Sequence, residues 1–60
     1  MNHHLLAFNF SRSTFEIVGS YFSYGEAYKR QNQVRQHFNY DGRPLEIVSS
    51  YELGRLEAIA

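Results

Sequence analysis

The sequence contains no cysteine, and it has one proline and four glycines in 60 residues. Without cysteine the chain forms no disulfide and offers no thiolate ligand to zinc. Its formal net charge is zero, so no overall field attracts nucleic acid or acidic lipid. No apolar run approaches the roughly eighteen residues of a membrane span, and the amino terminus lacks the basic start of a secretory signal. These absences favour a soluble, cytoplasmic protein.

The small size of the chain limits its stability. Residues 1–60 make one small domain, and such a domain buries only about 60% of the surface that its unfolded chain exposes. Apolar burial and conformational entropy then nearly cancel. Because no disulfide is available, self-association or binding to a larger protein is the remaining source of additional stability.

A strand followed directly by a helix organises the rest of the chain. Residues 15–22 are rich in β-branched and aromatic side chains, which indicates a strand. The serine and glutamate of Ser23-Tyr24-Gly25-Glu26 match a capping box, and the spacing then changes to that of a helix over residues 24–38. The predicted buried stripe of this helix is Tyr24, Ala27, Gln31, Val34 and Phe38.

Two further strands flank this unit. Residues 5–10 are apolar on both faces, which favours the middle of a sheet, and a polar turn joins them to the strand at 15–22. Residues 39–42 and Pro44 end the helix, and residues 45–51 form a third strand. Residues 52–60 have Leu53, Leu56 and Ile59 three apart, which indicates a short helical segment.

Together these elements predict an α+β fold of type β-β-α-β with a C-terminal helical stub. The crossover rule and the two-faced first strand give an antiparallel sheet of order 2-1-3, with the helix on one face. The side chains expected beneath the helix are Phe15, Ile17, Tyr21, Leu45, Ile47 and Tyr51. Those expected to be most buried are Phe8, Ile17, Val34, Phe38 and Ile47.

An internal repeat relates the second and third strands. The segment Glu-Ile-Val-Gly-Ser-Tyr at residues 16–21 returns as Glu-Ile-Val-Ser-Ser-Tyr at residues 46–51. Either two strands of similar composition match by accident, or a strand–helix unit is duplicated. Both explanations predict similar positions for the two strands in the sheet.

Residues with catalytic or metal-binding chemistry do not form a recognisable motif. His3, His4 and His37 lack the spacing of a metal site, and the serines show neither a nucleophile elbow nor a histidine nearby in sequence. The glycines are isolated, so no phosphate-binding loop is present. We therefore predict no enzyme activity, no cofactor and no small-molecule substrate.

The sheet face away from the helix is the candidate protein-binding surface. Val18, Phe22 and Val48 are expected on it, and Tyr21 and Tyr51 are expected as aromatic anchors at the ends of the edge strands. The alternative is that Leu53, Leu56 and Ile59 cover this face.

A basic segment is the candidate nucleic-acid surface. Lys29, Arg30, Arg35 and Arg43 lie between residues 29 and 43, with Tyr28 and Tyr40 among them. Cationic groups beside aromatic rings are typical of single-strand binding. The alternative is a solvated helix face with cations near its negative end.

These observations favour a non-enzymatic protein-binding domain that covers part of a larger partner. Compact chains of this size without catalytic motifs are typical of phage-encoded inhibitors or regulators, so we expect a viral protein of that kind. A small nucleic-acid-binding protein and a homodimeric structural module are the alternatives.

Overall fold

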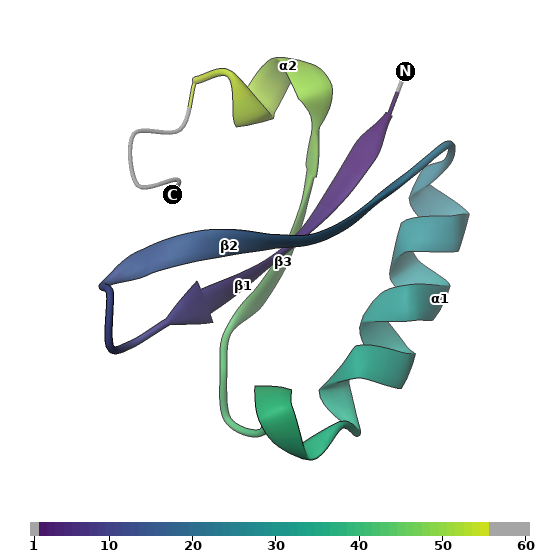
Figure 1. Ribbon diagram of the computed structural model, residues 1–60. Helices are drawn as coiled ribbons and strands as arrows, with labels where there is room; N and C mark the ends of the chain where they lie inside the picture. Colours follow the sequence, from purple (N-terminus) through teal and green to yellow (C-terminus); the bar gives the residue numbers. More distant parts are fainter. Residues whose placement is uncertain (1, 56–60) are drawn as a thin grey trace.

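The computed structural model describes residues 2–55, which form three strands and two α-helices (Figure 1). The elements are β1 (His3–Asn9), β2 (Thr14–Tyr21), α1 (Tyr24–Arg35), the 3-10 turn η1 (Phe38–Tyr40), β3 (Leu45–Ser49) and α2 (Ser50–Leu53). The predicted helical positions Leu56 and Ile59 lie outside the described residues.

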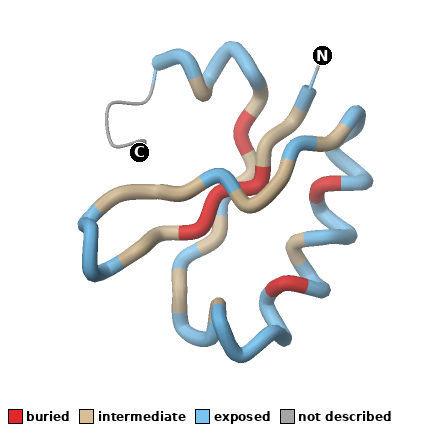
Figure 2. Tube along the Cα trace, in the orientation of Figure 1, coloured by how far each residue is buried: buried red, intermediate tan, exposed pale blue. Residues whose placement is uncertain are grey.

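The predicted α+β fold and strand order are confirmed. The sheet has the order β2-β1-β3, and β1 pairs antiparallel with both neighbours. Leu5, Leu6 and Ala7 follow one another in β1, and all three are completely buried (Figure 2). Because successive side chains of a strand point to opposite faces, this run needs cover on both sides of the sheet, which only a central strand receives.

The predicted start of α1 is confirmed at Ser23. Its hydroxyl accepts a hydrogen bond from the Glu26 amide at 3.2 Å. The Glu26 carboxylate accepts from the Phe22 amide at 3.4 Å, one residue before the amide that a capping box would use. From this start α1 contacts all three strands, with Ala27 and Val34 as its buried residues.

The helix ends at Arg35, so the predicted burial of Phe38 is wrong. His37 has an extended backbone, with φ of −84° and ψ of 134°, and its amide donates to the Val34 carbonyl at 2.9 Å. The chain therefore leaves the helix before Phe38, which sits in η1 with 81% of its surface exposed. Its ring stacks on His37 at a centroid distance of 4.8 Å.

A β-bulge in β2 corrects the predicted faces of that strand. Leu5 pairs with Gly19, but Leu6 pairs with Ile17, so Val18 is an extra residue. A bulge of this kind reverses the alternation of side chains beyond it. Phe15 and Ile17 consequently lie on the face away from α1, and Ile17 is 48% exposed. The predictions that both pack beneath the helix, and that Ile17 is buried, are wrong.

Glycine at position 19 fits the bulge, because the Tyr21 ring lies over it. A Cβ at residue 19 would stand 2.5 Å from the Tyr21 hydroxyl oxygen, closer than atoms in contact can approach. The close approach of another group is a common reason for glycine inside a strand.

The remaining core predictions have mixed outcomes. Val34 is buried, whereas Phe8 and Ile47 are half-buried. Tyr51 was expected beneath α1, but β3 ends at Ser49, whose hydroxyl accepts from the Glu52 amide and starts α2. Tyr51 therefore lies in α2 and is 68% exposed. The buried apolar residues in the described part of the chain are Leu5, Leu6, Ala7, Ala27, Val34 and Val48.

The contrast between Leu5 and Phe38 can be tested by urea denaturation. Leu5→Ala should reduce the free energy of unfolding by about 2–5 kcal/mol, because it leaves a cavity in the core. Phe38→Ala should change it by no more than about 0.5 kcal/mol, because the ring is exposed. A large loss in Phe38→Ala would show that residue 38 packs in the core.

Candidate functional site

The described residues contain neither a candidate membrane span nor a metal cluster. Among residues 2–55 no helix is long and apolar enough to cross a membrane. Within the same range no three histidine, aspartate or glutamate side chains gather around a point where a metal ion could sit. The candidate sites are therefore surfaces and cavities of the sheet and of α1.

The face of the sheet away from α1 is largely apolar, and we call it the outer sheet face. On it the Phe8 ring packs edge-to-face against Phe10 at 5.3 Å and against Phe15 at 5.1 Å between centroids. Phe10 is nevertheless 64% exposed. The face consists of His4, Leu6, Phe8, Phe10, Phe15, Ile17, Ser20, Glu46 and Val48.

A shallow pocket lies on the outer sheet face. It has a volume of about 210 Å³ and is lined by Leu6, Phe15, Val48 and Glu46. The first three residues are apolar, and the Glu46 carboxylate is the one charged group in the lining. Such a pocket suits an apolar side chain that carries or neighbours a cation.

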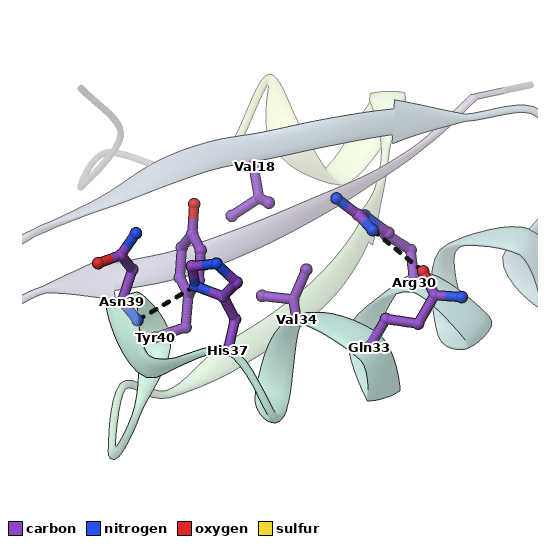
Figure 3. Close-up of a pocket in the computed structure, with 7 residues that line it drawn as sticks. All are labelled: Val18, Arg30, Gln33, Val34, His37, Asn39 and Tyr40. Carbon is purple, nitrogen blue, oxygen red and sulfur yellow. Dashed lines mark hydrogen bonds between the residues drawn. The ribbon is translucent and has the colours of Figure 1, made fainter.

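The predicted protein-binding residues do not all lie on this face. Val48 does, but it is buried. Val18 lies on the α1 side, where it lines a cavity with Val34 (Figure 3). Phe22 follows β2 and is 79% exposed, Tyr21 covers Gly19, and Tyr51 lies in α2 beneath the Arg55 guanidinium at 5.8 Å.

The exposed apolar residues of the outer sheet face are thus Phe10 and Ile17 rather than Val18 and Phe22. Sequence reasoning missed them because regular alternation through residues 15–22 assigns Ile17 to the wrong face. The isolated glycine at position 19 was the one available signal of a bulge.

The predicted basic residues do not form a single patch. Successive residues of a helix are rotated by about 100°, so Arg30 and Arg35 leave α1 in different directions. Arg30 lines the cavity beside Val34, whereas Arg35 does not. Arg43 is held within the fold by hydrogen bonds to β1, β2 and η1. Of the four predicted nucleic-acid contacts, Lys29, Arg30 and Arg35 remain available on α1. The side chain of Arg43 is engaged within the fold.

Arg43 connects four segments of the chain. Its guanidinium donates to the Phe8 carbonyl at 2.8 Å, to the Asn39 carbonyl at 3.3 Å and to the Glu16 carboxylate at 3.1 Å. It also lies over the Tyr40 ring, 4.9 Å from the centroid. The pKa of Glu16 is lowered, mainly because Asn9 donates a hydrogen bond to its carboxylate. The hydrogen bond and the positive charge of Arg43 lower this pKa further. The ion pair therefore stabilises the folded state when Glu16 is ionised.

A polar cluster that the sequence did not predict lies at the other end of β1. It consists of His4, Ser20 and Ser50, and we call it the His4 cluster. His4 Nδ1 is 2.7 Å from the Ser20 hydroxyl, and His4 Nε2 is 2.9 Å from the Ser50 hydroxyl. Ser20 and Ser50 occupy equivalent places in the internal repeat. The repeat thus supplies a hydroxyl to each side of one imidazole, although its two isoleucines lie on opposite faces of the sheet.

The His4 cluster has the beginnings of a nucleophilic site, namely hydroxyls within hydrogen-bond reach of an imidazole. Both ring nitrogens are engaged by the hydroxyls, however, and the Ser50 hydroxyl also donates to the Asn2 carbonyl at 3.3 Å. Its evident effect is to join β2 and α2 through β1.

No protein-family model, curated protein or solved structure matches the chain. Its function is therefore inferred from its own surfaces.

The Glu16–Arg43 ion pair should make stability depend on pH. Because the folded pKa of Glu16 lies below its ordinary value of 4.5, its contribution is complete above pH 4.5 and is lost as the pH falls through the folded pKa. The difference in unfolding free energy between the wild type and Glu16→Gln should therefore shrink on acidification. Arg43→Gln should reproduce this behaviour, and Arg35→Gln should not. Parallel pH curves for the wild type and Glu16→Gln would contradict the assignment.

The His4 cluster can be tested by a double-mutant cycle. His4→Ala should lower the free energy of unfolding by about 1–3 kcal/mol, because it removes two hydrogen bonds. Ser20→Ala should lower the free energy of unfolding less in the His4→Ala variant than in the wild type, because the two side chains interact directly. Additive losses measured by urea denaturation would show that the two residues act independently.

Proposed function

We propose that the chain is a non-enzymatic protein-binding domain that uses the outer sheet face to cover part of a larger protein. Its partner presents an apolar side chain beside a lysine or arginine. The observation that supports this proposal best is the exposed apolar surface around Phe10 and Ile17, next to a pocket bordered by Glu46.

The exposure of large apolar side chains supports a contact surface. Phe10 and Ile17 lie on one face of the sheet, next to the half-buried Phe8 and Phe15. Contiguous apolar surface on a small protein usually marks a site where another protein binds. Aromatic residues such as these are also enriched among the residues that dominate binding energy.

Glu46 specifies the charge of the partner. Its side chain lies at the pocket formed by Leu6, Phe15 and Val48, and no salt bridge or hydrogen bond engages its carboxylate within the described residues. A partner that buries this carboxylate must supply a cation, because an unpaired buried charge is strongly unfavourable. The pocket itself takes an apolar side chain.

The proposal can be tested by selecting binders from a random peptide library on the immobilised protein. Selected peptides should combine an apolar residue with an adjacent lysine or arginine. The Glu46→Arg variant should no longer bind these peptides and should select acidic peptides instead. The Glu52→Arg variant carries the same charge change in α2, away from the pocket, and should still bind the original peptides. Phe10→Ser should weaken binding while circular dichroism stays unchanged.

Other outcomes would overturn the proposal. Peptides whose binding is unaffected by both Glu46→Arg and Phe10→Ser would place the contact elsewhere. A dimer that light scattering detects in the wild type but not in Glu46→Arg would make a second copy the occupant of this face. Salt-sensitive binding of single-stranded oligonucleotides, lost on replacing Lys29, Arg30 and Arg35 with glutamine, would favour the nucleic-acid alternative.

A further inference from the structure

A cavity of about 310 Å³ lies on the α1 side of the sheet, separate from the outer sheet face (Figure 3). It is bounded by the bulge of β2, the C-terminal half of α1 and η1. Its volume lies at the lower end of the range for small-molecule sites. Val18 and Val34 extend into it from the sheet and the helix. Val18 is the extra residue of the bulge, and bulges are over-represented beside functional sites.

The polar lining of the cavity is cationic or neutral. Arg30 borders one end, and His37, Asn39 and Tyr40 border the other. No carboxylate is part of this lining. The Arg30 guanidinium has five N–H donors, and within the described residues its one hydrogen bond runs from Nη1 to the Gln33 side-chain oxygen at 3.0 Å. Arg30 therefore has donors available for an anion.

The opposite end of the cavity is pre-organised to donate a further hydrogen bond. His37 Nδ1 accepts from the Asn39 amide at 3.2 Å, so the neutral ring carries its proton on Nε2. The ring is held between Phe38, stacked at 4.8 Å, and Tyr40, edge-on at 6.0 Å. Tyr40 is in turn held beneath Arg43. Little ordering of this wall is needed when a ligand binds.

The position of the cavity disfavours an anion that carries more than one charge. It lies at the C-terminal end of α1, where the helix dipole is negative, and it contains one arginine. A phosphate dianion is usually held by helix N-terminal amides or by several cations. A carboxylate carries one charge and matches the planar fork of a guanidinium. The apolar surface between Val18 and Val34 suits a hydrocarbon body attached to that carboxylate.

We propose that this cavity binds a small organic carboxylate, with the carboxylate on Arg30 and an apolar, ring-sized body between Val18 and Val34. The site is independent of the proposed function, because it lies on the other side of the sheet.

The test is a titration of the isotope-labelled protein with benzoate, followed by NMR chemical shifts. Benzoate should shift the amides of Val18, Val34 and His37 with a Kd on the order of 1 mM. Benzyl alcohol, which has no negative charge, should bind more weakly than benzoate. Phenyl phosphate, which has a larger negative charge than benzoate, should also bind more weakly. Shifts confined to the outer sheet face, or none at all, would overturn the proposal, and so would tighter binding of phenyl phosphate.

Variants locate the carboxylate. Arg30→Gln should weaken benzoate binding about 10- to 100-fold, because a charge-assisted hydrogen bond is lost. Arg35→Gln removes the same charge from the same helix but outside the cavity, and it should leave the affinity unchanged. Val18→Phe should fill the cavity and abolish binding while the circular dichroism spectrum is retained. Equal affinities for Arg30→Gln and Arg35→Gln would show that Arg30 is not the ligand.

Discussion

The burial of three consecutive residues in β1 is the constraint on which the rest of the fold depends. Leu5, Leu6 and Ala7 point alternately to the two faces of the sheet, and none of them has exposed surface. Both faces must therefore be covered along this strand. On one side α1 provides the cover through Ala27 and Val34. On the other side Phe10 and Ile17 remain exposed although Leu6 is buried beside them. The central strand thus explains both the stability of the domain and its remaining apolar surface.

One extra residue in β2 separates the two candidate sites. Ile17 pairs with Leu6 on the outer sheet face, whereas Val18 lines the cavity on the α1 side. If the register of Phe8–Phe15 and Leu6–Ile17 continued without a bulge, Gly19 would lie opposite His4, but the bulge places Gly19 opposite Leu5. The bulge therefore allows Ile17 to face outward while Tyr21, four residues later, faces α1.

The features that could be predicted from the sequence are those determined by short segments. The start of α1 depends on Ser23 and Glu26, which are neighbours in sequence, and the central position of β1 follows from its apolar character on both faces. Features that depend on distant residues could not be predicted. The sequence places Arg43 among other basic residues, which predicts a basic surface. Its partners, the Phe8 carbonyl and the Glu16 carboxylate, are distant in sequence and reach Arg43 only in the fold. His4 was not assigned a role because Ser20 and Ser50 meet it only in the sheet. The end of α1 depends on an extended residue at His37 that no helix-breaking glycine or proline announces.

The order of the strands has a consequence for folding. β1 and β2 are joined by a short turn and can form a hairpin early, whereas β3 pairs with residues of β1 that are far away in sequence, so we expect this pairing to form later. Until then one edge of β1 offers its backbone groups to any matching strand. β3 of a second molecule matches this edge as well as the chain's own β3 does. At high concentration, refolding should therefore produce some exchanged dimers, in which each molecule completes the sheet of the other.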